Sequence, residues 1–420
     1  MDPSLVKIRK ILKKYGQEHL LSFYNELDDI HKEMLINQLS NINFEKVANL
    51  YSSLKDIPIP TNETIEPLEY FVKNDIPVKL RRQLENQGTE MLKKSQYAVI
   101  TMAGGQGTRL GHKGPKGTFE LNLFPKKESL FEILSDKLKQ ANKRYGIQIP
   151  WYIMTSQQNN NDTIKFFENK NYFNYDKNNI HFFTQDKLPL VSSIDGKILL
   201  SEPYQVNEAS NGNGNLFKAL KNYNFINKMK SDGIKWVFVS GIDNILVKVA
   251  DPLFLALTCN NSQVGAKTIF KKDPYSKDWV FCRKNGKPSM LGYQRITDEI
   301  TNANIDGKFL FREINILCHL FSIDVLEKIA NLDLPYHRAT KKNTYINAEG
   351  MKIVPDFPNS YKFETFIFDA FRFFDNITLL RVQEDKEFAP IKDPVGIYSP
   401  DTATKLYLKE EFEILNNYIT

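Results

Sequence analysis

Residues 97–111 read YAVITMAGGQGTRLG. An apolar, β-rich run leads directly into a glycine loop, which is typical of a buried parallel strand that ends at a ligand site. Similar apolar runs follow at 151–154, 180–183 and 236–239, with helix-like stretches between them. Strands that alternate with helices predict an α/β domain with a mostly parallel sheet. In such a domain, ligands bind beyond the carboxyl ends of the strands.

The segments on either side of this domain have a different pattern. Apolar residues recur at spacings of three and four in residues 5–12 and 19–39, which predicts helices. After about residue 390 the chain reads as a loop and a final helix. We therefore expect three consecutive parts: an N-terminal helical domain at 1–95, an α/β catalytic domain at 96–385 and a short C-terminal segment at 386–420.

The composition argues against several classes of protein. The 420 residues are 41% hydrophobic, and the formal net charge is only +6. This small, dispersed excess favours anionic substrates weakly and provides no basic stripe for nucleic acid. No run of about 18 apolar residues suggests a membrane span, and the N-terminus lacks the apolar stretch of a secretory signal. We expect a cytoplasmic protein without nucleic-acid or membrane partners.

The cysteines and histidines show no metal-ligand or disulfide pattern. Cys259, Cys282 and Cys318 are far apart and odd in number, and no CxxC occurs. We therefore expect reduced thiols that pack as small hydrophobic groups. The six histidines lack the spacing of metal ligands.

The glycine loop is a candidate phosphate site. Adjacent glycines let backbone N–H groups approach a base or a phosphate closely. Arg109 and Lys116 follow at short range and offer a forked cation and a point cation. A Walker A loop does not fit this spacing, and the dinucleotide pattern fails because Leu110 stands where its last glycine belongs. A ligand-free turn would explain the glycines alone, but the two cations favour phosphate binding.

Residues 103–121, AGGQGTRLGHKGPKGTFEL, resemble the signature of the UDP-sugar pyrophosphorylases, most closely the UDP-N-acetylhexosamine pyrophosphorylases. Further blocks that are similar to the family follow in its order along most of the chain: GQEHLLSFYNEL (16–27), WYIMTS (151–156), FFTQDKLP (182–189), NGNGNLFKAL (211–220), GIDNILVKVADPLF (241–254), KFETFIFDAF (362–371) and EFAPIKD (387–393). The resemblance implies a glycosyltransferase-A-like α/β fold with a doubly wound mixed sheet, flanked by small terminal parts.

The reaction that the resemblance implies is uridylyl transfer. A sugar 1-phosphate, either N-acetylglucosamine 1-phosphate or a related hexose 1-phosphate, attacks UTP and releases pyrophosphate and a UDP-sugar. The nucleophile is already an anion, so the protein must position two polyanions and stabilise charge on the phosphates. Family matching places the catalytic cations at Arg109, Lys116, Lys362 and Lys392. It places the nucleotide contacts at Ala103, Gly104, Gly105, Gln185, Gly212, Asn213 and Asp243.

Asp243 would also bind Mg²⁺ or Mn²⁺, because it follows the strand at 236–239 and Mg²⁺ needs few protein carboxylates beside phosphates. Each residue also has an ordinary structural interpretation. Asp243 could cap a turn, and Lys362 and Lys392 could be solvated surface lysines. Only their positions in matching blocks favour the functional roles.

Two positions depart from the family where it recognises the sugar. Gly292 stands where a glutamate is usual, and Cys318 stands where an asparagine is usual. Loss of a carboxylate and an amide would remove directional hydrogen bonds to sugar hydroxyls. A regulatory protein that binds UTP without transfer is therefore the alternative. A protein that only binds UTP has less use for all five of the charged site residues, which are Arg109, Lys116, Asp243, Lys362 and Lys392. An NAD-dependent oxidoreductase is a third and weaker possibility.

Overall fold

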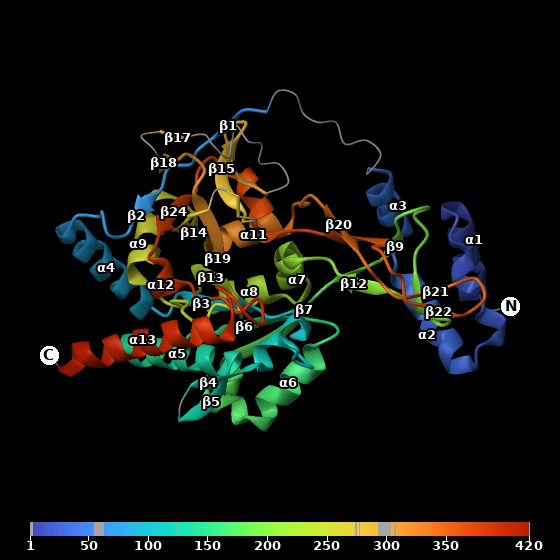
Figure 1. Ribbon diagram of the computed structural model, residues 1–420, viewed down its shortest axis with the longest axis horizontal. Coiled ribbons are helices and arrows are strands. Elements are labelled where there is room, and N and C mark those ends of the chain that lie inside the picture. Colours follow the sequence, from blue (N-terminus) through green and yellow to red (C-terminus); the bar gives the residue numbers. More distant parts are fainter. Residues whose placement is uncertain are drawn as a thin grey trace. The chain divides into compact units, whose positions relative to one another are not determined.

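Strand β3 (Tyr97–Met102) lies inside a mixed sheet, between β13 and β6 (Figure 1). The computed structural model describes residues 3–53, 63–123, 125–273, 275–276, 278–292, 304–305 and 308–419. The strands follow the order β2 (Phe71–Val72), β24 (Thr378–Arg381), β14 (Val264–Phe270), β19 (Glu313–Ser322), β13 (Trp236–Gly241), β3, β6 (Trp151–Ser156) and β7 (Ile180–Gln185). Beside this order, β15 (Val280–Lys284) pairs with β19, β16 (Lys287–Leu291) and β1 (Ile65–Glu66).

The mixed α/β fold expected from the sequence is confirmed. Strands β13, β3, β6 and β7 are parallel neighbours, and β19 runs antiparallel between β13 and β14. All six residues of β3 and of β6 are buried, as expected for strands that are covered on both faces. Because the four strands are parallel, their carboxyl ends lie along one edge of the sheet. Ala103, Gln185 and Asp243 are at these ends.

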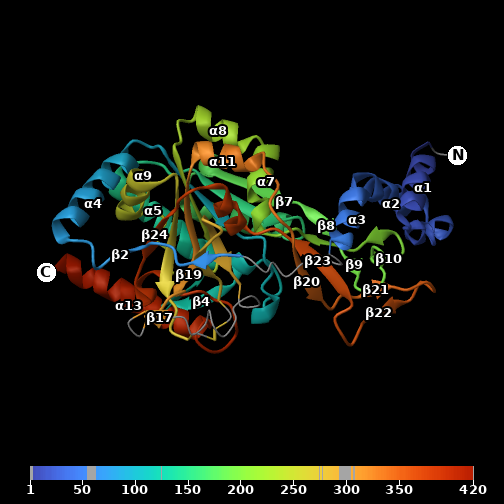
Figure 2. The same ribbon diagram turned by 90° about the horizontal axis from the view of Figure 1, so that it is seen from above.

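Helices cover both faces of the sheet. Helices α4 (Val78–Lys93), α5 (Leu130–Tyr145) and α9 (Pro252–Asn261) share one apolar core with Leu320 of β19. The next residue, Phe321, points to the opposite face and contacts Phe217 of α7 (Leu216–Asn222). Helix α7 packs with α8 (Phe225–Ser231) and α11 (Ile323–Ala330), as Figure 2 shows.

The remaining elements around the large sheet are short, apart from one long helix at the end of the chain. Helix α6 (Asn160–Asn169) follows β6, α12 (Glu384–Glu387) follows β24, and the expected final helix is α13 (Pro400–Ile419). Two small hairpins are β4 (Glu120–Leu123) with β5 (Lys126–Ser129) and β17 (Asn304–Ile305) with β18 (Lys308–Phe309). None of the helices in the described part of the chain has the length and apolar content needed to cross a bilayer.

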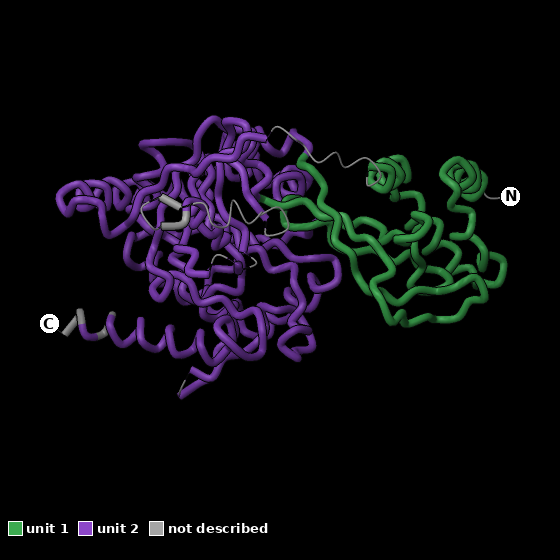
Figure 3. Tube along the Cα trace, turned by 45° about the horizontal axis from the view of Figure 1, so that its top comes forward, with its two compact units in different colours: residues 1–61, 186–215, 334–367 green, residues 62–185, 216–333, 368–420 purple. Residues whose placement is uncertain are grey.

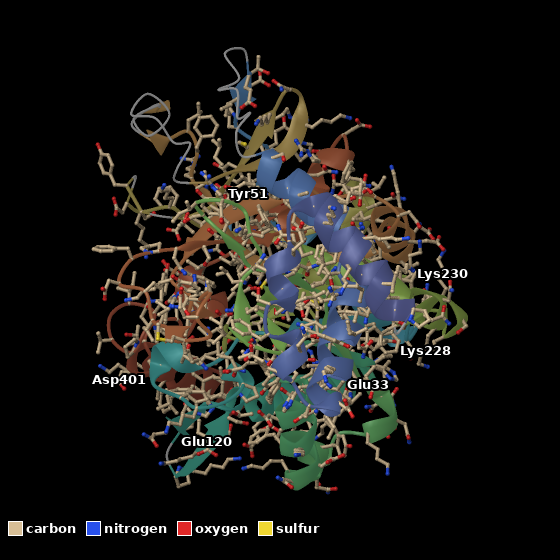
Figure 4. The ribbon with its side chains drawn as sticks, turned by 90° about the vertical axis from the view of Figure 1, so that its right-hand side faces the viewer. Glu33, Tyr51, Glu120, Lys228, Lys230 and Asp401 are labelled. Atoms are coloured by element: carbon tan, nitrogen blue, oxygen red, sulfur yellow. The ribbon has the colours of Figure 1, made fainter. Side chains whose placement is uncertain are left out.

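Surface charges form ion pairs within and between neighbouring helices. Lys228 pairs with Asp232 at 3.0 Å within the α8 region, and Lys230 pairs with Glu327 of α11 at 2.5 Å (both lysines are labelled in Figure 4). Solvent-exposed pairs of this kind contribute at most about 1 kcal/mol each. They agree with a net charge that is dispersed rather than gathered into a stripe.

The chain divides into two compact units that are interleaved in the sequence (Figure 3). Unit 1 contains residues 1–61, 186–215 and 334–367, and unit 2 contains 62–185, 216–333 and 368–420. The parts expected from the sequence are consecutive, with a first boundary near residue 95. In the structure, residues 62–95 group with the sheet instead, because α4 packs against α9.

Unit 1 combines the N-terminal helices with strands from two later segments. Its elements are α1 (Pro3–Tyr15), α2 (Asp29–Asn41), α3 (Phe44–Ser52), β8 (Lys187–Pro189), β9 (Val191–Ser192), β10 (Leu200–Glu202), β11 (Gln205–Val206), β12 (Glu208–Ser210), β20 (His337–Lys341), β21 (Tyr345–Ile346), β22 (Lys352–Ile353) and β23 (Ser360–Glu364). Leu12, Leu20 and Leu35 of the helical region share a core with Val191 and Phe363. The amphipathic helices thus bury their apolar faces against strands that are distant in the sequence.

Gly88 of α4 is the point of closest approach to α9. A Cβ atom on Gly88 would lie 1.9 Å from the carbonyl oxygen of Pro252. We predict that Gly88→Ala lowers the free energy of unfolding by about 2 kcal/mol, because the helices must separate to admit the methyl group. Chemical denaturation measures the change. The partly exposed Glu85→Ala variant in the same helix is the control and should shift stability by less than about 0.5 kcal/mol. A Gly88→Ala variant as stable as the parent would contradict this packing.

Candidate active site

The glycine loop is closed on itself by backbone hydrogen bonds. Ala103 follows β3, and its N–H donates to the carbonyl of Met154 at 2.7 Å, which extends the pairing with β6. The N–H of Lys116 donates to the carbonyl of Gly105 at 3.0 Å. This bond returns the chain to the glycines, so the loop places Lys116 beside the strand end. The sequence alone showed only that the two were close along the chain.

Asn159 anchors the glycine loop by hydrogen bonds from its side chain. Sequence analysis did not identify this residue. Its Nδ2 donates to the carbonyls of Ala103 at 3.0 Å and Gly105 at 3.2 Å. Its Oδ1 accepts from the N–H of Ser156 at 2.8 Å. Asn159 is fully buried. Its amide therefore fixes the positions of the two loop carbonyls. An asparagine between a strand and a helix usually reads as a turn residue, so no local signal distinguishes it.

Gln185 and Gly104 come together across the ends of β7 and β3. A Cβ atom on Gly104 would lie 2.1 Å from Nε2 of Gln185. Any other residue at position 104 would therefore displace the buried Gln185 side chain. The structure thus brings together two residues that the resemblance assigns to the nucleotide. The close approach of Gln185 also explains why position 104 is a glycine.

Lys116 and Asp243 are direct neighbours. The Lys116 Nζ lies 3.1 Å from Oδ2 of Asp243, and the side chains are 17% and 27% exposed. Both side chains therefore remain accessible to a ligand while they contact each other. The contact joins the glycine loop to the end of β13.

The segment that carries Lys392 is tied to the same strand end. The N–H of Ile391 donates to the carbonyl of Asp243 at 3.0 Å. The side chain of Asn244 donates to the carbonyl of Glu387 at 2.8 Å and accepts from the N–H of Ala389 at 2.9 Å. Residues 387–391 therefore run alongside the end of β13, and Lys392 comes next. Asn244, like Asn159, is a residue that sequence analysis did not single out.

Lys392 and Arg109 have no strong ionic partners among the described residues. The Lys392 Nζ lies over the rings of Tyr398 at 4.8 Å and Phe388 at 5.6 Å. Arg109 pairs with Asp393 at 3.6 Å, with 71% of its side chain exposed. An exposed pair at this distance is weak. Both cations are therefore available to anions at the end of β13, and the Asp393 contact places Arg109 next to the Lys392 segment.

A buried ion cluster supports this segment. The Lys267 Nζ lies 2.7 Å from Oδ2 of Asp251 and 2.5 Å from Oε2 of Glu387, and Lys267 is 1% exposed. Lys73 contacts the other oxygen of Glu387 at 2.6 Å. Burial is the largest single effect and would raise the pKa of the Glu387 carboxyl, but the ammonium groups of Lys267, Lys73 and Lys248 together outweigh it and the pKa is lowered. Glu387 is therefore a charged anchor. A lysine inside the apolar run 264–270 is the sequence signal that could have revealed the cluster.

Three of the expected site residues lie in unit 1. Gly212 and Asn213 lie beside the end of β23, where Oδ1 of Asn213 accepts from the N–H of Ile367 at 3.0 Å. Lys362 of β23 pairs with Glu364 at 2.7 Å, and both side chains are about one-fifth exposed. Unit 1 therefore brings the segment of Gly212 and Asn213 next to the strand that carries Lys362. The contact of Lys362 with a phosphate stays a prediction.

The two positions that depart from the family are both buried. A Cβ atom on Gly292 would lie 2.8 Å from the ring of Trp279, so this ring occupies the space beside the glycine. Cys318 lies on β19 and pairs with Ser240. Burial raises the pKa of the Cys318 thiol to about 12. All three cysteines are free thiols, as expected, although Cys259 is exposed.

Comparison with known proteins identifies the family. The family model described as UTP--glucose-1-phosphate uridylyltransferase matches residues 38–398. The chain belongs to this family. It is 33% identical to the UDP-N-acetylglucosamine pyrophosphorylase of Saccharomyces cerevisiae, over 96% of this chain and 89% of the yeast protein. It is 32% identical to the human UDP-N-acetylhexosamine pyrophosphorylase-like protein 1, over 96% of this chain and 84% of that protein.

A solved structure of the uridylyltransferase family has the same architecture. The Trypanosoma brucei uridine diphosphate N-acetylglucosamine pyrophosphorylase, solved with an inhibitor, superposes with a TM-score of 0.81 at 26% identity. The match covers 97% of this chain and 85% of the trypanosomal chain. The doubly wound fold and the family resemblance expected from the sequence are therefore confirmed.

Glu387 offers a test of the buried ion cluster. We predict that Glu387→Gln lowers the free energy of unfolding by about 3 kcal/mol or more, because Lys267 and Lys73 lose a buried counter-charge. Denaturant unfolding measures this change. Glu384→Gln is the matched control in the same helix, since its partner Lys272 is 76% exposed and the loss should stay below about 1 kcal/mol. Equal losses in the two variants would contradict an anchoring role for Glu387.

Proposed function

We propose that this protein transfers the uridylyl group of UTP to an N-acetylhexosamine 1-phosphate and forms a UDP-sugar and pyrophosphate. Membership of the uridylyltransferase family supports the reaction class. The named relatives in yeast and human support the N-acetylhexosamine acceptor. The observation that carries the proposal is the 3.1 Å contact between Lys116 and Asp243 beside the glycine loop. This contact holds a cation beside the carboxylate that we propose binds the metal.

The reaction needs electrostatic stabilisation more than proton transfer. A phosphate oxygen of the sugar 1-phosphate attacks the α-phosphorus of UTP. A new P–O bond forms while the bond from the α-phosphorus to the bridging oxygen breaks, and pyrophosphate leaves with the electron pair. The attacking oxygen is already an anion, so no base has to remove a proton. Cations that stabilise charge on the phosphates supply the catalysis.

The available cations suit this task. Lys116 and Arg109 bind the triphosphate and neutralise the leaving pyrophosphate in our proposal. Lys392 and Lys362 bind the α-phosphate or the sugar 1-phosphate. Lys392 can leave its aromatic contacts at modest cost, since an exposed cation–π contact is worth about 1 kcal/mol or less. A charge-assisted bond to a phosphate oxygen is stronger.

The nucleotide's base would lie on the glycine loop. Asn159 fixes the loop carbonyls, so the backbone of Ala103, Gly104 and Gly105 can face uracil in our proposal. Gln185 offers both a donor and an acceptor to the edge of the base. From the family resemblance we propose that Gly212 and Asn213 also contact uracil and ribose.

The residues at the end of β13 fit a divalent cation. A Cβ atom on Gly241 would lie 2.8 Å from Oδ1 of Asp243, so the glycine keeps open a cradle beside this oxygen. Among the described residues, no group of three His, Cys, Asp or Glu side chains could bind a metal alone. Mg²⁺ commonly uses one or two carboxylates and completes its shell with phosphates and water. We therefore propose that Asp243 binds Mg²⁺ or Mn²⁺, which supplies positive charge to the phosphates.

Pyrophosphate release tests the proposed function. UTP is incubated with the 1-phosphates of N-acetylglucosamine, N-acetylgalactosamine, glucose and galactose, and we expect the N-acetylhexosamine esters to be used best. If another ester is used best, the proposed N-acetylhexosamine acceptor is wrong but the proposed uridylyl transfer is supported. If UTP binds by calorimetry and no ester releases pyrophosphate, the regulatory alternative replaces the enzyme. The cytoplasmic location stays a prediction.

Lys116 should make a large contribution to the rate. We predict that Lys116→Ala lowers kcat/KM at least about tenfold, which corresponds to about 1.4 kcal/mol of transition-state stabilisation. The loss follows because the alanine side chain cannot neutralise charge on the leaving pyrophosphate. Steady-state pyrophosphate release measures the effect, and Lys113→Ala in the exposed part of the same loop is the control. A similar, small effect in both variants would show that Lys116 only shapes the loop.

Asp243 should determine the metal dependence. We predict that Asp243→Asn abolishes turnover at any Mg²⁺ concentration, because a neutral amide binds the cation poorly. The variant should still unfold cooperatively, since Asp243 is partly exposed and its carbonyl contact with Ile391 is retained. Activity against Mg²⁺ concentration and a thermal unfolding curve are the two measurements. Full activity in the variant would remove Asp243 from the metal site.

A further inference from the structure

Strand β19 is distorted next to the proposed site. Its pairing with β14 shifts between Ala266, which faces His319, and Thr268, which faces Asn315. Three residues of β14 thus span the same length as five residues of β19. Leu317 lies in the middle of this bulge and has a φ of +56°. Bulges commonly re-aim a side chain next to an active site.

The backbone of Leu317 is strained. A left-handed conformation costs about 1–2 kcal/mol for a residue with a Cβ atom. In the described part of the chain, the other non-glycine residues with positive φ lie in turns, at helix ends or in the short 3-10 segment at Asn171–Asn174, and Leu317 lies inside a strand. Such strain persists only where surrounding contacts impose it, and it is often found at functional sites.

Asn315 and His319 impose this conformation. Oδ1 of Asn315 accepts from the N–H of Leu317 at 2.9 Å and lies 3.0 Å from Nε2 of His319. His319 is fully buried, and burial lowers the pKa of its imidazole to about 3. The ring is therefore neutral at ordinary pH, and its Nε2–H donates to the asparagine oxygen. One amide oxygen thus bridges the two sides of the bulge.

The bulge directs the Leu317 side chain toward Asp243. A Cβ atom on Gly241 would lie 3.2 Å from Cδ2 of Leu317 and 2.8 Å from Oδ1 of Asp243. The leucine methyl group and the carboxylate oxygen therefore border the same small space. Leu317 is only partly buried, so an apolar group is exposed beside the proposed metal ligand.

We propose that Leu317 is the residue that selects the substituent at C2 of the acceptor sugar. The inference rests on the proposed function, in which Asp243 lies next to the reacting phosphates. In a sugar 1-phosphate, C2 is bonded to C1, the carbon that carries the phosphate. The substituent at C2 is therefore the group nearest to the reacting phosphate that differs between hexoses and N-acetylhexosamines. The leucine methyl group can pack against an acetamido methyl group but cannot hydrogen-bond a hydroxyl. It therefore favours N-acetylhexosamines over hexoses.

The test compares two acceptors in three variants. The ratio of kcat/KM for N-acetylglucosamine 1-phosphate to that for glucose 1-phosphate is measured in the parent, Leu317→Gly and Leu317→Asn. Glycine removes both the contact and the strain, and asparagine tolerates the left-handed backbone but is polar. We expect the ratio to fall about tenfold in both variants, while the KM for UTP stays unchanged.

Ser95→Gly is the matched control. Ser95 has a φ of +55°, is exposed and lies beyond α4. Its replacement relieves the same kind of strain away from the site, so stability should rise slightly and the acceptor ratio should stay constant. If Leu317→Gly likewise changes only stability, or if the parent does not prefer the N-acetylated acceptor, the specificity role is overturned.

Ligand binding separates this inference from the proposed reaction. Calorimetry with UDP-N-acetylglucosamine and UDP-glucose measures the same preference without turnover. A parent preference that is lost in Leu317→Gly supports the role of Leu317 even if no acceptor releases pyrophosphate, and in that case only the proposed reaction fails. Equal binding of the two UDP-sugars by the parent overturns the role of Leu317. The proposed reaction is then still tested separately by the pyrophosphate assay.

Discussion

The side chain of Asn244 joins the end of β13 to the segment at 387–391. Asp243 directly precedes this asparagine, and Lys392 directly follows the segment. One buried amide therefore sets the separation of a carboxylate and a cation that are far apart in the sequence, the two groups that we propose bind the metal and a phosphate. A buried amide with both its donor and its acceptor satisfied has few alternative positions. The Lys267 cluster holds the same segment by the side chain of Glu387.

Three lysines of unit 2 differ in burial and pairing. Lys267 is buried and contacts two carboxylates, so it has no capacity left for a ligand. Lys116 and Lys392 are held by one partly exposed carboxylate and by aromatic rings. Contacts of the second kind are exchanged for phosphate oxygens at small cost. Lys267 stabilises the fold, and the other two lysines are suited to the substrates.

Much of the fold followed from residues that are neighbours in the sequence. The run at 97–102 and the three similar runs became parallel strands, and the final helix formed where its spacing indicated. The antiparallel insertion of β19 did not follow, because an apolar run does not reveal its direction. The interleaving of 186–215 and 334–367 with the first helices did not follow either. Apolar periodicity identifies a buried face but not the segment that covers it.

The sequence by itself determined which chemical groups are present: a glycine loop, its two cations, and an aspartate after a strand. It also determined their local geometry, because strand propensity and glycine backbones act over a few residues. Only the tertiary structure decided that Lys116 meets Asp243, that Asn159 and Asn244 hold the loops, and that Leu317 adopts a left-handed conformation. These features depend on strand order and on contacts between distant segments, which local propensity does not encode.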